Sequence, residues 1–263
     1  MFQINNLIKI ILTLTHITFL ISCHTTVVKP PQHPVKFEKA VSILANDLLK
    51  QIENEQNLLD FGNNKFILLE PFNEAFHGDI IKSSKKIEEI IIAEGKKNFS
   101  QFTINKMESQ QLDNANYLIS GIVHYQLYKD EEFFRNIQAS VIDLKKSTVV
   151  ANSKVWISKD ETGSEPALDR IMDMREASDV KHIKRATSPP GTPISLPNNY
   201  LKIKALLSEA TTAYLAQDYN HAFYLFNRAT QGNDEQLMEA YAGVYQSSMA
   251  LGEQDKASEA YRK

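Results

Sequence analysis

The chain has 263 residues, of which 43% are hydrophobic, and its 29 Lys and Arg against 32 Asp and Glu give a net charge of −3. This length is enough for one or two domains with hydrophobic cores of their own. A charge balance so close to zero gives no basic field of the kind that nucleic-acid-binding proteins carry, so no nucleic acid is expected among the partners.

An apolar run from Leu7 to Ile21 dominates the first 22 residues, with Lys9 as the only charged side chain. The run is interrupted by Thr and His and falls short of the roughly 20 apolar residues that a membrane span needs. It is typical of a secretory signal peptide. Its end, Leu-Ile-Ser-Cys, resembles the lipobox of bacterial lipoproteins, with cleavage between Ser22 and Cys23. The alternative is an ordinary signal followed by an incidental cysteine.

Cys23 is the only cysteine of the chain. In an oxidising periplasm a lone thiol invites mispairing, and acylation would consume it. The resemblance implies a covalent diacylglycerol and an N-acyl lipid such as palmitate at Cys23, and no other cofactor is expected. Two or more acyl chains anchor a protein stably in a membrane. His24 stands where enterobacterial inner-membrane lipoproteins carry Asp, which favours the outer membrane, with the protein facing the periplasm.

Two proline clusters divide the rest of the chain. The first makes residues 23–35 a stiff tether. The second belongs to the charged, weakly patterned residues 161–199, which we interpret as a flexible linker. The linker contains a small basic group, Lys181, His182, Lys184 and Arg185. We interpret this group as solvated, with contact to anionic glycan or lipid as the alternative.

Helical and strand patterns alternate in residues 36–160, which we expect to form one domain. Apolar residues repeat at helical spacing over 37–52, and the short apolar run 66–69 predicts a buried strand. A second amphipathic helix is expected from residue 80 to its C-terminal glycine, Gly95, followed by a short strand near 102–104.

Three longer strands follow at 117–127, 133–141 and 148–157, where apolar and polar side chains alternate. Such alternation predicts strands with one buried face, so His124 on the polar phase is expected at the surface. Short polar links between the strands predict antiparallel neighbours. The element order predicts an α+β fold, an α/β sandwich with helices on one face of a mixed sheet that ends in a three-strand antiparallel meander.

Two stretches of this domain resemble a family of bacterial envelope lipoprotein domains. They are Ala-Asn-Tyr-Leu-Ile-Ser-Gly at 115–121 and Ala-Ser-Val-Ile-Asp-Leu-Lys-Lys-Ser-Thr-Val-Val-Ala-Asn-Ser at 139–153. The family includes the flagellar outer-membrane protein O, the B-type activator of penicillin-binding proteins and the curli-secretion lipoprotein. Leu-Leu-Glu-Pro-Phe at 68–72 resembles their L-P-F segment, whereas Lys146 or Ser147 replaces their turn glycine. The resemblance implies the fold and leaves the task open.

Residues 200–263 resemble two tetratricopeptide repeats, the second of them incomplete. Ala222 and Ala257, which would let paired helices approach closely, are 35 residues apart, near the usual period of about 34. The alternative is a generic pair of helical hairpins. In such repeats the first helices line a groove that binds peptides, and the apolar members would serve as anchors and the charged members as a rim. These positions are Lys204, Leu207, Thr211, Tyr214, Glu239, Ala242, Gln246 and Met249.

No motif of catalysis or metal binding stands out. The sequence contains no HExxH, paired CxxC, GxSxG or phosphate-binding glycine loop, so no catalytic residue, no metal and no enzyme activity are expected. Glu74, His77 and Asp79 lie close together in a polar turn, where such side chains are usually solvated rather than bound to a metal.

These features predict a lipid-anchored adaptor or scaffold of an outer-membrane assembly, in flagellar, secretion or cell-wall machinery. It would bind envelope proteins or peptides through its α/β domain and its repeats. The alternative is an activator of a peptidoglycan synthase, by analogy with the activators of penicillin-binding proteins. A pore subunit like the curli channel is disfavoured, because the hairpin links are too short and too charged to supply transmembrane strands.

The lipid anchor gives the first testable prediction. Cys23→Ser removes the thiol that would be acylated, so the variant is expected to leave the membrane fraction. Fractionation followed by a salt wash of the membranes measures this. A Ser variant that still sediments with the outer membrane would place the anchor elsewhere.

Overall fold

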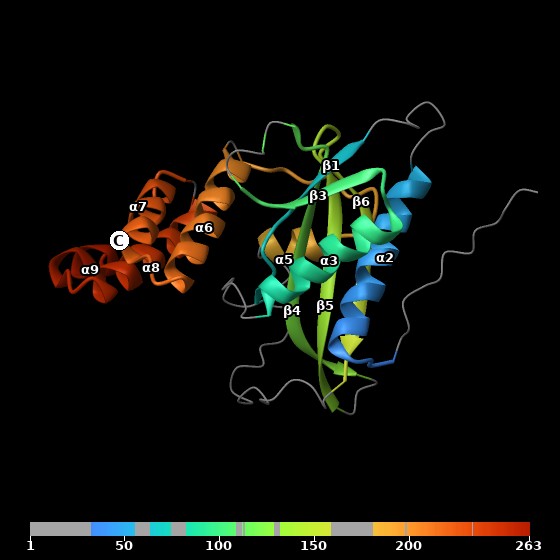
Figure 1. Ribbon diagram of the computed structural model, residues 1–263, viewed down its shortest axis with the longest axis horizontal. Helices are drawn as coiled ribbons and strands as arrows, with labels where there is room; N and C mark the ends of the chain where they lie inside the picture. The colour runs from blue at the N-terminus through green and yellow to red at the C-terminus, as the bar shows by residue number, and fades with distance from the viewer. Residues whose placement is uncertain are drawn as a thin grey trace, which may run out of the picture.

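The structure is a computed structural model with a mixed α+β fold. It describes residues 33–55, 64–74, 83–108, 112, 114–128, 132–158, 181–197, 199–232 and 234–263. Seven helices and six strands lie within these ranges. Figure 1 shows a twisted sheet with helices packed against it and a group of four helices to one side. The expected signal peptide, the lipobox and nearly all of the tether lie outside the described residues.

One six-stranded sheet organises the first part of the chain, in the order β3-β1-β4-β5-β6, with β2 paired to β4. The strands are β1 (Lys65–Leu69), β2 (Asn73–Glu74), β3 (Phe102–Lys106), β4 (Tyr117–Tyr128), β5 (Glu132–Asp143) and β6 (Thr148–Ile157). β1 runs parallel to both of its neighbours, β3 and β4. The pairs β4–β5 and β5–β6 are antiparallel.

Two helices, α2 (Phe37–Glu55) and α3 (Ser84–Asn98), cover one face of the sheet. The expected stripe on α2 is confirmed, since Val41, Leu44, Leu48 and Ile52 are all fully buried. They meet the inward side chains of the central strands in one apolar cluster. Burying one such side chain stabilises a fold by about 1.5–3 kcal/mol, so this cluster is the main core of the sheet.

The end of α3 differs from the prediction. The helix continues past Gly95 to Asn98, and the amide of Phe99 donates to the Gly95 carbonyl oxygen. A Cβ atom added at Gly95 would lie 2.4 Å from Cδ1 of Ile104 on β3. The glycine therefore allows β3 to approach the helix, and the signal that predicted a helix end marks a close contact instead.

The second face of the sheet is also covered, which corrects the expectation of helices on one face only. A short helix, α5 (Lys181–Thr187), packs on β4, β5 and β6. His124 is consequently buried with 1% of its surface exposed, and it is not the surface histidine that the alternation predicted. An alternating pattern shows which face of a strand is polar, but it does not show what that face contacts. Here the polar face contacts α5 rather than water.

The polar face of the sheet binds the end of α5 through hydrogen bonds. Ser140 Oγ donates to the Arg185 carbonyl oxygen at 2.5 Å, and Asn152 Nδ2 donates to the Ala186 carbonyl oxygen at 3.1 Å. The last carbonyl groups of a helix have no partner within the helix. Ser140 on β5 and Asn152 on β6 supply those partners, so these two side chains keep hydrogen bonds where the helix end covers them.

Part of the expected flexible linker, residues 181–197, is packed against the sheet. The segment after α5 runs beside β6, where the amide of Val149 donates to the Thr192 carbonyl oxygen at 2.9 Å. The middle of β6 exchanges hydrogen bonds between the Asn152 backbone and the Gln51 side chain, and its end pairs with Val35. The segment after α5, the Gln51 side chain and Val35 together cover a sheet edge that would otherwise offer its backbone to other chains.

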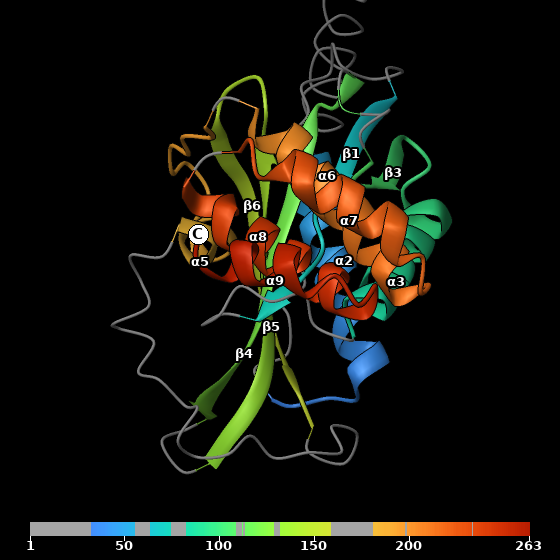
Figure 2. The ribbon, with the colours of Figure 1, turned by 90° about the vertical axis from the view of Figure 1, so that its left-hand side faces the viewer.

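The four remaining helices pack as two hairpins with a common core. They are α6 (Tyr200–Leu215), α7 (Tyr219–Ala229), α8 (Asp234–Ala250) and α9 (Gln254–Tyr261). Figure 2 views them with the sheet behind. The turns within the two hairpins repeat at an interval of 35 residues. Gln217 and Gly252 both have positive φ, at 64° and 76°, and the same three backbone hydrogen bonds surround each of them.

Gly121 on β4 supports a second close contact. A Cβ atom there would lie 2.1 Å from the ring of Phe72, which follows the end of β1. Both residues belong to segments on which the expected family resemblance rests, and the fold brings those two segments together. Phe72 is fully buried, so its ring cannot move aside without opening the core.

We therefore expect Gly121→Ala to destabilise the protein by about 1–3 kcal/mol through overpacking against Phe72. Urea unfolding of Gly121→Ala, Phe72→Leu and the double variant measures this as a double-mutant cycle. The smaller Leu should relieve part of the cost, so the double variant should be less unstable than the sum of the single changes. Strictly additive costs would show that the two side chains do not meet.

Candidate functional site

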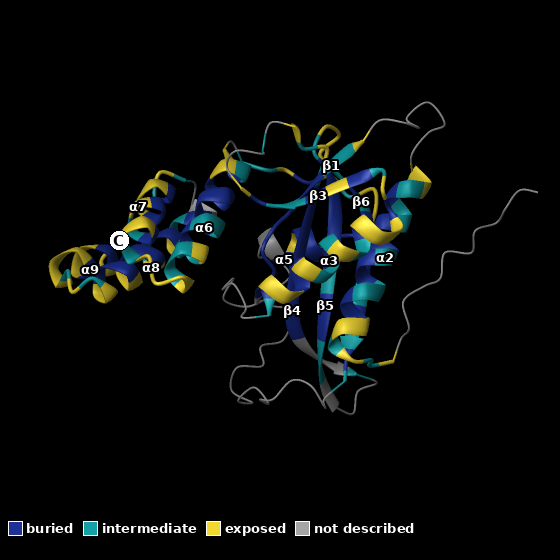
Figure 3. Ribbon diagram, viewed as in Figure 1, coloured by how far each residue is buried: buried dark blue, intermediate teal, exposed yellow. Residues whose placement is uncertain are grey.

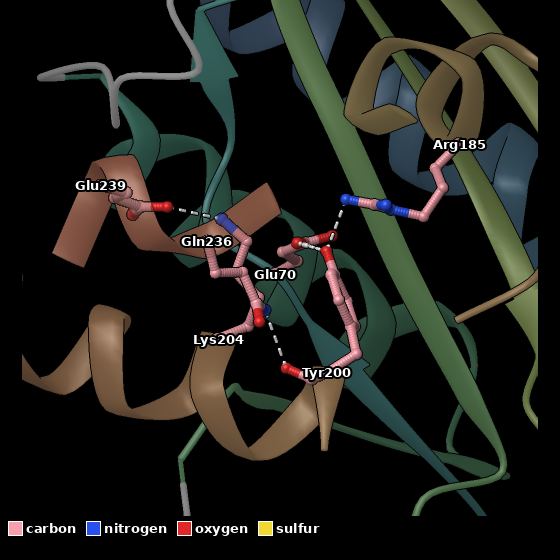
Figure 4. A network of polar contacts seen from close by, with 6 residues as sticks. All are labelled: Glu70, Arg185, Tyr200, Lys204, Gln236 and Glu239. Atoms are coloured by element: carbon pink, nitrogen blue, oxygen red, sulfur yellow. Dashed lines mark hydrogen bonds and ion pairs between the residues drawn. The ribbon is translucent and has the colours of Figure 1, made fainter. Parts of the chain in front are cut away.

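A buried network of polar side chains joins the sheet to the helical hairpins (Figure 4). Glu70 follows β1, Arg185 lies on α5, Tyr200 begins α6, Lys204 follows one turn later, and Glu239 lies on α8. The first four expose no more than 7% of their surface. We call these five residues the junction network, because they come from the end of β1 and from helices α5, α6 and α8.

Tyr200 is the centre of the junction network. Its hydroxyl donates to Glu70 Oε1 at 2.5 Å and accepts from Arg185 Nη2 at 2.6 Å. The Arg185 guanidinium carbon also lies 4.5 Å from the centre of the Tyr200 ring. One phenol thus links the end of β1 to α5 and to the first turn of α6, by hydrogen bonds to charged groups, which are stronger than neutral ones.

Lys204 extends the network to the second hairpin. Its Nζ lies 2.9 Å from Glu239 Oε2 on α8. Beside it, Gln236 Nε2 donates to the Tyr200 carbonyl oxygen at 3.1 Å. The first turn of α6 is therefore connected to α8 in two ways, through the Lys204 side chain and through the Tyr200 backbone carbonyl group.

Charge pairing keeps the buried groups ionised. Burial raises the pKa of Glu70, but the cations of Arg185 and Lys204 and the Tyr200 hydrogen bond outweigh it, so this pKa lies below its ordinary value of 4.5. Burial lowers the pKa of Lys204, but the carboxylates of Glu239 and Glu70 outweigh it, so this pKa lies above 10.5. Two acids and two bases neutralise each other, as buried charges require.

The predicted groove residues do not form one exposed surface. Leu207 is 1% exposed and packs in the helical core, so it is not an apolar anchor. Lys204 and Glu239 are paired with each other and not available as a charged rim. Thr211 and Tyr214 are half-buried, and the ring of Tyr214 packs against Tyr219. Only the three α8 positions, Ala242, Gln246 and Met249, are exposed.

Three members of the junction network were missed or misread in the sequence. Glu70 carried a usable signal, because an acid between a buried apolar run and a proline is unusual. Arg185 was grouped with solvated basic residues, yet only 3% of its surface is exposed. Tyr200 carried no signal, since an aromatic residue at a helix start has many roles. Their grouping depends on contacts across 130 residues of chain, between Glu70 and Tyr200.

The described part of the chain shows no second kind of site built on a metal ion. No group of three or more His, Cys, Asp or Glu side chains within it is arranged to hold a metal ion. His77 and Asp79 lie outside the described residues, and the side chain of Glu74 is not described. Within the same ranges, none of the helices has both the length and the apolar character needed to cross a membrane.

Comparison with known proteins identifies no relative. No protein-family model, no curated protein and no solved structure matches this chain. The junction network and the surface of the helical hairpins are therefore interpreted from their own geometry.

The large hydrophobic side chains that are exposed in the described residues all lie in the hairpins. Figure 3 shows exposed residues along the outer sides of α7 and α9. The large hydrophobic side chains exposed on the four hairpin helices are Leu215, Tyr224, Met238, Tyr245, Met249 and Tyr261, with exposures between 37% and 81%. All six follow residue 199, so the sheet and its helices keep their described large apolar side chains covered.

The junction network predicts that Tyr200→Phe costs about 1–3 kcal/mol of unfolding free energy, because Glu70 and Arg185 lose a buried hydrogen-bond partner. Glu70→Gln should cost about 3–5 kcal/mol, because it leaves two buried cations with one carboxylate. Urea unfolding at pH 7 measures both. The exposed Tyr224→Phe is the matched control and should change stability by less than about 0.5 kcal/mol. Equal effects of the two Tyr→Phe changes would contradict the network.

The lowered pKa of Glu70 also predicts an acid response. Its stabilising contribution is complete above the ordinary value of 4.5 and is lost as the pH falls from there through the folded pKa. Between pH 5 and pH 3 the unfolding free energy of the wild type should therefore fall more steeply than that of Glu70→Gln. Parallel curves for the two proteins would show that Glu70 does not titrate in this way.

Proposed function

We propose that this protein is a lipid-anchored adaptor of the outer membrane, facing the periplasm, that binds envelope proteins or peptides through its helical hairpins. The observation that carries the proposal is the distribution of exposed apolar side chains. All six large ones found in the described residues belong to residues 200–263. Interaction sites are typically found where a protein exposes several large apolar side chains, so the hairpins are the candidate binding region.

We infer that the hairpins are two tetratricopeptide-like repeats. The support is the interval of 35 residues that relates their turns, Gln217 and Gly252, and their buried small residues, Ala222 and Ala257. Lys204 and Glu239 are related by the same interval and face each other across α6 and α8. Repeats that stack in this way present extended surfaces to protein partners.

The α/β part would act as the base that holds the repeats. We interpret it as a sandwich of helices and sheet whose last three strands form a meander of the envelope lipoprotein type. Support comes from the antiparallel pairing of β4, β5 and β6 and from the contact of Phe72 with Gly121, which joins two of the family-like segments. The junction network fixes the repeats on this base, and Cys23 would fix the base to the membrane.

The test is site-specific photo-crosslinking in intact cells, with a photoreactive residue placed at Met249. Because Met249 is exposed on α8, this probe should give a discrete adduct with an envelope protein. The same residue at Glu89, which is exposed on α3 of the base, is the matched control and should give much less. No adduct at Met249, or the same adducts at both positions, would contradict an adaptor that binds through its hairpins.

A further inference from the structure

A groove lies where the sheet meets the start of the helical hairpins. Its volume is about 970 Å³, at the upper end of the range of ligand-binding sites. Its walls are the turn between β5 and β6, the extended residues 193–197, the first turn of α6, and Leu112. None of the six exposed side chains that carry the adaptor proposal lines it, so the groove is a separate feature of the molecule.

The floor and walls of the groove are mostly apolar. Ile194 and Tyr200 are 6% and 1% exposed, and both belong to an apolar cluster beneath the groove. Half-buried leucines pack against that cluster and line the groove, namely Leu112, Leu144, Leu196 and Leu201. Each leaves part of its apolar surface in water, and a ligand that covers such surface gains about 25 cal/mol per Å².

The charged groups of the groove are all positive. Lys146 and Lys202 are exposed, and no Asp or Glu is found among the described lining residues. Lys146 approaches Asp143 at 3.6 Å, but its side chain is 68% exposed, and such surface pairs contribute little. The first turn of α6 adds the positive end of a helix dipole, and the side chain of Asn199 does not cap it. The groove therefore favours a ligand with a negative charge.

Hydrogen bonds hold the walls of the groove in place. Asp143 Oδ1 accepts from the Lys146 amide at 2.8 Å, which fixes the turn between β5 and β6. The amide of Ile194 donates to the Ser147 carbonyl oxygen at 2.8 Å, which ties residues 193–197 to that turn. Tyr200 is held by the junction network. A groove that is formed before a ligand binds loses little conformational entropy when it is filled.

We propose that this groove binds a peptide segment of a partner protein in which an acidic residue stands beside two or three apolar residues. The apolar side chains would cover the leucines, and the carboxylate would lie beside Lys146 and Lys202. This inference goes beyond the proposed adaptor function, because it adds a binding site on the base and the first turn of α6, apart from the exposed side chains of the hairpins.

The position of the groove favours a peptide over a membrane lipid. β6 begins directly after Ser147, which lines the groove, and ends at Ile157, which pairs with Val35. A strand of ten residues spans about 30 Å. The chain that leads to the proposed anchor, Cys23, therefore leaves the sheet at the end remote from the groove, and the groove is placed for a ligand of the periplasm.

The test begins with a phage-displayed library of random heptapeptides, panned on the full chain with Cys23→Ser. We expect the enriched sequences to carry Asp or Glu beside Leu, Ile or Val far more often than the unselected library. The charge-reversed variant Lys146→Glu/Lys202→Glu should not enrich them. Lys96→Glu/Lys97→Glu is the matched control, since it makes the same change of charge at two exposed positions of α3, and it should enrich the same sequences.

Fluorescence polarisation of the most enriched peptide, labelled with fluorescein, then measures affinity. Lys146→Glu/Lys202→Glu should weaken binding at least about ten-fold, because each reversal replaces an attraction by a repulsion. Leu196→Ser should weaken binding at least about three-fold, because it removes apolar surface from the wall. Lys96→Glu/Lys97→Glu should leave affinity unchanged. Circular dichroism should show the same fold in all variants, and the two lysine variants suffice if Leu196→Ser fails to fold.

Several outcomes would overturn the proposal. They are no enrichment, enriched peptides without acidic residues, and equal affinity of the two lysine variants. Binding to phosphatidylglycerol vesicles that only Lys146→Glu/Lys202→Glu abolishes, without peptide enrichment, would assign the groove to a lipid headgroup. A dimer in sedimentation that this variant dissociates would assign it to a second copy. If Met249 adducts form in cells and no peptide is enriched, only this inference falls. If a peptide binds and no adduct forms, the adaptor function falls instead.

Discussion

The arrangement of this molecule depends on the burial of charged groups at one junction. Removing an ion from water costs several kcal/mol, and only well-placed partners offset that cost. Glu70, Arg185 and Lys204 are all removed from water, and they meet through the Tyr200 hydroxyl and the Glu239 carboxylate. The end of β1 and helices α5, α6 and α8 must therefore keep one relative placement, because any displacement would leave a charge buried without its partner.

This constraint explains why the sheet has two different faces. The face toward α2 and α3 is apolar, and its packing needs only shape and volume. The face toward α5 is polar and buried, with Ser140 and Asn152 bound to the carbonyl groups at the helix end. A short helix such as α5 has little stability alone, so these hydrogen bonds and the contacts of Arg185 hold it in place. The position of α5 in turn places Arg185 beside Tyr200.

The stacked helices of the two hairpins continue this fixed placement beyond the junction. The base covers the start of α6, α8 covers α7, and Lys204 and Glu239 join the two hairpins at positions related by the repeat interval. A surface on α8 and α9 is thus held at a fixed distance and orientation from the sheet. In the proposed adaptor function, such rigidity would reduce the entropy lost when a partner binds.

The sequence by itself determined most elements of the fold and their order, although β2 was not predicted and α5 lies in the expected linker. The stripe of α2, the strand at β1 and the three long strands follow from apolar periods of 3.6 and 2, which depend only on local geometry. The spacing of Ala222 and Ala257 likewise indicated paired helices. The tertiary structure decided what covers each face. Gly95 predicted a helix end and proved to be a contact with Ile104, and His124 predicted a surface and proved to be interior.

The junction network could not be predicted from the sequence, for the same reason. A polar residue is equally polar whether it meets water, a helix end or an opposite charge, so its type does not reveal its partner. Glu70, Arg185 and Tyr200 are far apart in the chain, and only packing of the helices on the sheet brings them within hydrogen-bonding distance. The local pattern shows which side chains can be buried at little cost in free energy. Whether a charged group can be buried depends on which groups the complete fold places around it.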